Sequence, residues 1–246
     1  MGITSLLEII IFFPLTFFVP FPSLEIWYLL FITIIIHVLY RFNVIYSYKF
    51  GDLSYVYPIS RGGSSLLIAI ISILFLNSSI SIVGFLGIVI VCIGLFLISF
   101  SSKIKLNKMA FYLAVSTALL ITTYTLIDGI GVRNSANGFS YIFWLIALNG
   151  VPILIFSIFS KNGLRRKNTY SIKSGIAAGI FATLSYALVV WAMQFIEIAY
   201  VSGIREVSII FATLIGVYFL SEKFGTKRII PSILIAIGIL TVYLQI

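Results

Sequence analysis

Long apolar runs, interrupted by short polar breaks, occupy almost the whole chain. Each run is about long enough to cross a bilayer as a helix, because a hydrocarbon core about 30 Å thick needs roughly 20 residues that rise about 1.5 Å each. The runs are continuous, which favours helices over the alternating pattern of half-buried strands. Lipid offers the backbone no hydrogen-bond partner, so a bundle of helices is expected. Nine spans are predicted, at residues 3–20, 26–47, 53–76, 80–100, 108–130, 139–160, 172–195, 199–220 and 228–245.

The composition agrees with a polytopic membrane protein of the all-α class. Hydrophobic residues make up 61% of the 246 positions and charged residues 9%, whereas a soluble domain carries about 25% charged residues. The single cysteine, Cys92, excludes a disulfide within the chain, and the single histidine, His37, excludes a multi-histidine metal centre. The sequence shows no phosphate-binding loop, no Ser/His/Asp set and no carboxylate pair at catalytic spacing. We therefore expect no enzymatic activity, no cofactor and no metal.

The positive charge is unevenly distributed among the loops, which predicts the topology. Basic loops resist translocation, so the side that collects them is expected to be cytoplasmic. With nine crossings, the N-terminus would then lie inside and the C-terminus outside the cytoplasm. A multi-pass protein of the cell membrane is expected, and the charge is no evidence for a nucleic-acid partner. The basic loops are residues 47–53, 101–108, 160–173 and 221–228.

An internal repeat accompanies this pattern. Residues 53–100 and 199–245 both form a predicted hairpin, and an offset of 145 aligns Tyr55 with Tyr200. Five crossings separate the two copies, and an odd number places them in opposite orientations in the membrane. Inverted repeats around a site at the midplane are typical of secondary transporters.

The repeat predicts two halves of unequal length. Residues 1–105 form the first half, with four helices, and residues 106–246 form the second, with five. The repeat partner of the 108–130 span would precede residue 1. The expected arrangement is therefore that of a ten-helix protein without its first helix.

Charged side chains within the predicted spans are candidate functional residues, because a charge in lipid costs several kcal/mol unless it is paired or hydrated. Arg61 and Arg205 are the strongest candidates for binding a solute, since both lie well inside their spans. Tyr57 and Trp191 lie a few residues inside span ends and are candidates to line a cavity. The alternative for these two aromatic residues is simple anchoring at the membrane interface.

Glu206 is a candidate for proton coupling or for an ion pair. Its neighbour Arg205 is adjacent in sequence, so on a helix the two side chains diverge by about 100° and cannot both face one point. A structural pairing of Glu206 with Arg61 or with Arg41 is the alternative to a role in transport.

Asp128 and His37 are the other candidates for proton coupling or for an ion pair. For Asp128 the alternative is a solvated carboxylate at a helix end, paired with Arg133. For His37 the alternative is a core histidine whose hydrogen bonds are satisfied.

Several motifs, in this order, resemble the EamA-type transporters of the drug/metabolite transporter superfamily. They are GDLSYVYPISRG at 51–62, YTLIDGIGVR at 124–133, YALVVWAM at 186–193 and IREVSIIFATLIGVYFLSEKFGTKR at 204–228. The resemblance implies ten helices in two inverted five-helix halves, with a central cavity that opens alternately to either side. The motif residues of this family fall on Tyr57, Pro58, Arg61, Asp128, Arg205, Glu206 and Ser208.

The sequence and the resemblance together predict a secondary transporter that exports or exchanges a small polar or amphipathic metabolite. Its expected partners are the lipid bilayer and the solute, and the sequence leaves open a homodimer or a heterodimer. The alternative function is that of a non-transporting or assembly-partner membrane subunit, or of a truncated inactive copy.

Overall fold

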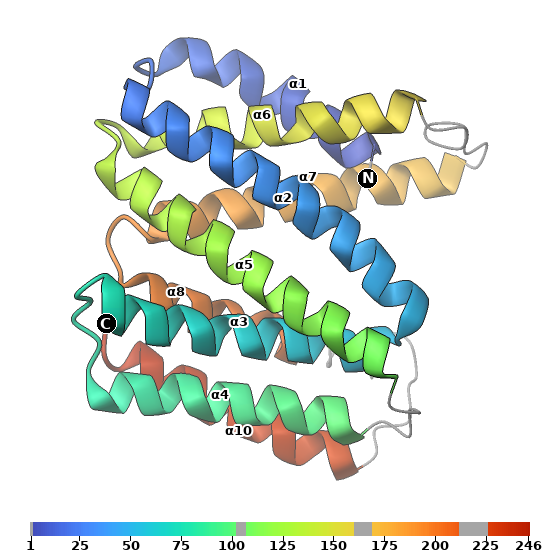
Figure 1. The fold of residues 1–246 in the computed structure, drawn as a ribbon, viewed down its shortest axis with the longest axis vertical. Coiled ribbons are helices and arrows are strands. Elements are labelled where there is room, and N and C mark those ends of the chain that lie inside the picture. Colours follow the sequence, from blue (N-terminus) through green and yellow to red (C-terminus); the bar gives the residue numbers. More distant parts are fainter. Residues whose placement is uncertain (1, 102–106, 160–168, 212–225) are drawn as a thin grey trace. The chain divides into compact units, whose positions relative to one another are not determined.

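The computed structural model describes residues 2–101, 107–159, 169–211 and 226–246, which are almost entirely helical and form no strand (Figure 1). The expected all-α class is therefore confirmed for this part of the chain. The elements are α1 (Gly2–Leu15), the 3₁₀ turn η1 (Thr16–Phe18), α2 (Leu24–Phe50), α3 (Leu53–Phe75), α4 (Ile82–Ser101), α5 (Lys108–Asn134), α6 (Gly138–Phe159), α7 (Thr169–Ala192), α8 (Ile198–Arg205) and α10 (Thr226–Tyr243).

Six helices of the described residues are long and apolar enough to cross a membrane, and they coincide with the second to seventh predicted spans. The first and ninth predicted spans correspond to shorter apolar helices, Gly2–Phe18 and Ile230–Tyr243. The eighth predicted span, 199–220, extends beyond the described residues after Phe211. Nine crossings thus stay a prediction, whereas a multi-pass arrangement is supported by these six helices.

The turn between α3 and α4 follows from local chemistry. Asn77 has a φ of 49°, in the left-handed region that asparagine tolerates better than most residues. The Ser78 amide donates to the Ser72 carbonyl at 3.2 Å and closes the end of α3. The chain reverses here, as expected of a short hairpin.

The chain divides into two compact units, and each draws on both predicted halves. The first consists of Met1–Leu39 and Ile127–Phe195, and the second of Tyr40–Leu126 and Ile196–Ile246. The predicted boundary between the halves, at residues 105 and 106, lies outside the described residues. The division into halves therefore stays a prediction.

In the first unit, α1 packs closely on α6 and α7. The contact with α6 is close because Gly150 has no side chain: a Cβ there would lie 2.6 Å from the Ser5 carbonyl oxygen. Gly179 has the same role on α7, where a Cβ would lie 2.8 Å from Cγ2 of Thr4. Small residues at helix contacts let backbones approach, as is usual in membrane bundles.

In the second unit, α3 packs against α4 and α8, and α4 packs along α10. Gly87 near the start of α4 lies against Gly238 and Val242 near the end of α10, whereas Gly94 lies against Ile235. Residue numbers rise along α4 as they fall along α10, so these two helices are antiparallel (Figure 1).

The same crossing yields a test of the packing. A Cβ on Gly238 would lie 2.7 Å from the Gly87 carbonyl oxygen and 2.8 Å from the Val91 amide nitrogen, and neither backbone atom can rotate away. We expect Gly238→Ala to destabilise the protein by about 1–3 kcal/mol, because overpacking forces the two helices apart. Thermal unfolding in detergent measures the effect.

The matched control is Gly175→Ala. The nearest atoms to a Cβ at Gly175 belong to the Ile3 side chain, at 3.6 and 3.9 Å, which is ordinary van der Waals contact. We expect no loss of stability in this variant, and an equal loss in both would contradict a specific role for the α4–α10 crossing.

Candidate functional site

The second unit contains a buried ion pair between two of the predicted site residues. Arg61 projects from α3, and Glu206 directly follows α8. The Arg61 Nη2 atom lies 2.8 Å from Oε1 of Glu206, and Nε donates to Oε2 at 3.2 Å. The contact is therefore bidentate, which suits the planar guanidinium. Glu206 is 1% exposed and Arg61 9% exposed.

Two serines extend this cluster. Ser65, one helical turn after Arg61, donates to Oε1 of Glu206 at 3.4 Å and lies 3.2 Å from the Ser202 hydroxyl. All four side chains are buried. We call Arg61, Ser65, Ser202 and Glu206 the Arg61–Ser65 cluster. Its polar contacts join α3 to α8.

The backbone changes its hydrogen-bond pattern at Glu206. The Glu206 amide donates to the Gly203 carbonyl at 3.2 Å, three residues back, and the Ile209 amide donates to the Glu206 carbonyl at 3.0 Å. Such three-residue bonds tighten and interrupt an α-helix. The helical residues 207–211 therefore continue after a break at the buried carboxylate.

Arg61 and Glu206 are separated by 145 residues, which is the offset of the predicted repeat. The predicted repeat would therefore place the two charges at equivalent positions of its two hairpins. Along α3 and α8, Arg61 faces Glu206 and Ser65 faces Ser202, so these two helices are antiparallel.

The remaining predicted solute-binding residues lie outside the ion pair. The Arg61 guanidinium carbon lies 5.9 Å from the centre of the Tyr57 ring, which is within cation–π range, and Tyr57 is 36% exposed. Arg205 is half-buried, on a different side of the helix from Glu206. Trp191, in the first unit, is exposed and packs edge-on against Phe195. Solute binding by these residues stays a prediction.

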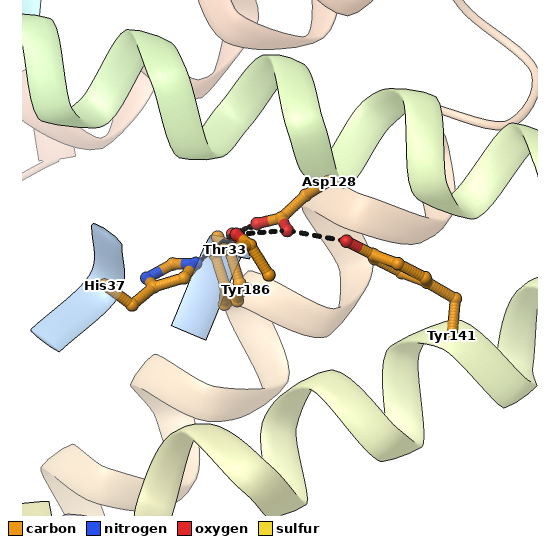
Figure 2. A network of polar contacts seen from close by, with 5 residues as sticks. All are labelled: Thr33, His37, Asp128, Tyr141 and Tyr186. Carbon is orange, nitrogen blue, oxygen red and sulfur yellow. Dashed lines mark hydrogen bonds and ion pairs between the residues drawn. The ribbon is translucent and has the colours of Figure 1, made fainter. Parts of the chain in front are cut away.

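The first unit contains a second polar cluster around Asp128, a carboxylate with no exposed surface (Figure 2). Its Oδ1 atom accepts a hydrogen bond from Thr33 of α2 at 2.7 Å and one from the Tyr141 hydroxyl of α6 at 2.9 Å. Its Oδ2 atom lies 3.1 Å from Nε2 of His37, also on α2, and accepts from the Tyr186 hydroxyl of α7. Four helices therefore meet at this carboxylate, which belongs to α5.

The Tyr186 hydroxyl also lies 3.2 Å from Nε2 of His37. Oδ2 of Asp128, the Tyr186 hydroxyl and the histidine nitrogen thus form a triangle. The Tyr186 hydroxyl has one proton and donates it to Asp128, so the remaining contacts are satisfied when Nε2 of His37 carries a proton. We call Thr33, His37, Asp128, Tyr141 and Tyr186 the Asp128 network.

Gly131 explains how Tyr141 reaches Asp128. A Cβ on Gly131, one turn after Asp128 on α5, would lie 2.5 Å from Cζ of Tyr141. The tyrosine ring therefore lies against the bare backbone of α5 and is fully buried there. The close packing holds its hydroxyl at the carboxylate.

The structure shows the partners of the residues for which the sequence left alternatives open. The pairing of Glu206 with Arg61 is present, and His37 is a buried histidine with polar partners. The alternative in which Asp128 is a solvated helix end paired with Arg133 is wrong. Asp128 is fully buried among donors from other helices, and Nε of Arg133 donates to the Met193 carbonyl at 2.7 Å.

The predicted site residues do not include Thr33, Tyr141, Ser65 or Ser202. Tyr186 appears in the sequence analysis only as the first residue of the family motif at 186–193. One signal was available: Thr33 and His37 are four residues apart and therefore share a face of α2. Nothing in the sequence places Tyr141 or Tyr186 beside that face. Among the described residues, no group of three or more His, Cys, Asp or Glu could hold a metal ion.

Comparison with known families gives a match. The sequence profile of the EamA-like transporter family matches residues 108–244, more than half of the chain. The predicted family resemblance is therefore confirmed. No curated protein matches the chain.

The Arg61–Glu206 pair can be tested by a double-mutant cycle. We expect Arg61→Met and Glu206→Met to destabilise the protein by about 3–5 kcal/mol each, because each leaves a buried charge without its partner. The double variant should lose less stability than either single variant, since it buries no unpaired charge. Unfolding free energies in detergent measure all three, and additive losses would contradict direct coupling between the two residues.

Proposed function

The chain belongs to the EamA-like transporter family, and from this premise we propose that it is a secondary transporter that exports or exchanges a small polar or amphipathic metabolite by alternating access. Besides family membership, the buried Arg61–Glu206 pair supports this proposal. A charge pair inside a membrane bundle marks a candidate solute or ion pathway, because it is expensive to bury without a function.

An inverted repeat is part of the proposal. The antiparallel pairing of α3 with α8 and of α4 with α10 supports it, since each pair joins elements related by the repeat offset. The separation of Arg61 and Glu206 by the repeat offset supports it further. In such repeats, binding and coupling sites lie near the midplane, where the two copies meet.

The break at Glu206 gives this pair a means of rearranging. Interrupted helices in transporters place free backbone groups and charges beside a solute. We propose that an anionic group of the solute competes with Glu206 for Arg61, with Tyr57 beside the guanidinium, and that Arg205 attracts anionic solutes from its own, different side of the helix. Solute binding by Trp191, in the first unit, stays a separate prediction.

An export screen tests this function. Cells that lack their own metabolite exporters, with and without the chain, are compared by mass spectrometry of the small molecules in the medium. We expect the chain to increase the export of a specific polar or amphipathic compound, and Arg205→Gln to reduce that export at least about tenfold, as expected when a charged contact of about 1.4 kcal/mol or more is lost.

Arg205 is chosen because it lies outside the buried pair, so its loss does not leave Glu206 unpaired. The matched control is Lys173→Gln, which removes one positive charge at an exposed position of α7. Export that is unchanged in Arg205→Gln contradicts the role of that arginine. No difference between cells with and without the chain contradicts transport and favours an assembly-partner subunit.

The topology is part of the same proposal, with nine crossings in the cell membrane and an extracytoplasmic C-terminus. We expect a membrane-impermeant maleimide to label Gln245→Cys in intact cells and to leave Lys108→Cys unlabelled until the cells are opened. Both positions are exposed, and the native Cys92 is buried. Labelling with the opposite pattern would reverse the orientation derived from the basic loops.

A further inference from the structure

The geometry points to Asp128 as a proton-binding site whose protonation releases α7 from the helices around it, with Tyr186 as the residue that transmits the change. The inference rests on the proposed function, in that proton binding would then accompany transport. The supporting observation is the fully buried carboxylate of α5, which is in contact with four hydrogen-bond donors from α2, α6 and α7 (Figure 2).

The ionised form of Asp128 fits the network. A carboxylate only accepts hydrogen bonds, with about four acceptor positions on its two oxygens. Two donors face Oδ1, namely Thr33 and Tyr141, and two face Oδ2, namely His37 and Tyr186. The same saturation argues against a metal cation at this position, because a cation would have to displace donors that are already bound.

A proton on Asp128 disturbs this arrangement. The group then carries an O–H that must itself find an acceptor, while its oxygens lose the negative charge that attracts the donors. At least one of the four donations to Asp128 is therefore lost, either because a hydroxyl reverses to accept the new O–H or because a donor turns away.

Tyr186 is the donor that can leave. Thr33, His37 and Tyr141 are buried, and Tyr141 is held by its packing against Gly131. Tyr186 is the partly exposed member of the network. It is also the member on α7, so its departure removes the hydrogen bonds of α7 to both Asp128 and His37.

Other titratable and charged groups lie on the helices that form this unit. On α2, Arg41 follows His37 by one helical turn, and on α5, Arg133 donates to the Met193 carbonyl. On α1, the buried Glu8 lies beside Gly150, which is nine residues along α6 from Tyr141. The groups in direct hydrogen-bond contact with Asp128 in the described residues are those of the network itself.

The first test detects the proton directly. Infrared difference spectra of the purified full-length protein in detergent are recorded between alkaline and acidic buffer. We expect acidification to produce protonated-carboxyl absorption that is weaker in Asp128→Asn, which lacks one of the seven carboxyl side chains of the chain. A band of equal intensity in Asp128→Asn would overturn the assignment of the proton to Asp128.

The second test follows α7 by hydrogen–deuterium exchange, with protection factors corrected for the intrinsic effect of pH. In the wild-type protein we expect the protection of α7 to fall about tenfold on acidification, the change that corresponds to the loss of one hydrogen bond to a charged group. In Tyr186→Phe the protection should be low in both buffers. This variant removes a single hydroxyl and keeps the inference testable if Asp128→Asn does not fold.

Tyr28→Phe is the matched control, because it removes a tyrosine hydroxyl from an exposed position of α2. It should retain the pH response of the wild-type protein. Wild-type protection that is equal in both buffers, or a pH response that persists in Tyr186→Phe, would overturn the role of Tyr186. Neither measurement needs a transported solute, so failure of this inference is distinguishable from failure of the export screen.

Discussion

In lipid, a charged or polar group can be satisfied only by other groups of the protein, because no water is present to replace a missing partner. This constraint governs both polar clusters of the chain. Arg61 and Glu206 satisfy it by opposite charge in a bidentate contact, and Asp128 satisfies it by accepting from four neutral or histidine donors. The helices that carry these groups are held together because the partners are on different helices.

The ion pair and the Asp128 network differ in what disrupts them. An ion pair yields when another charge competes for one of its members, whereas a carboxylate surrounded by donors yields when its own charge is removed by a proton. The Arg61–Ser65 cluster therefore suits recognition of a charged solute, and the Asp128 network suits a response to protonation. Each cluster lies within one compact unit of the chain.

Small residues allow close helix contacts in both units. Gly131 lets the Tyr141 ring lie against α5, and Gly87 and Gly238 let α4 and α10 cross at close range. Apolar area drives helix association weakly in a bilayer, since lipid tails are as apolar as leucine, so close backbone contact and polar partners make larger contributions. The glycines and the buried polar residues are thus complementary parts of one packing scheme.

The sequence by itself determined the helical class, the membrane environment, the family and the positions of six long apolar helices, because these depend on local apolar runs and on motif order. It also identified Arg61, Glu206, His37 and Asp128 as unusual, since a charge or an imidazole inside a span is unusual whatever surrounds it. Only the tertiary structure decided their partners. Thr33, Tyr141 and Tyr186 reach Asp128 from 95, 13 and 58 residues away, and polar residues of this kind are also common as interface anchors and in helix contacts. Arg133, five residues from Asp128 and of the right charge, was the obvious partner in sequence, yet it binds a carbonyl because helix packing, and not proximity along the chain, sets which groups meet.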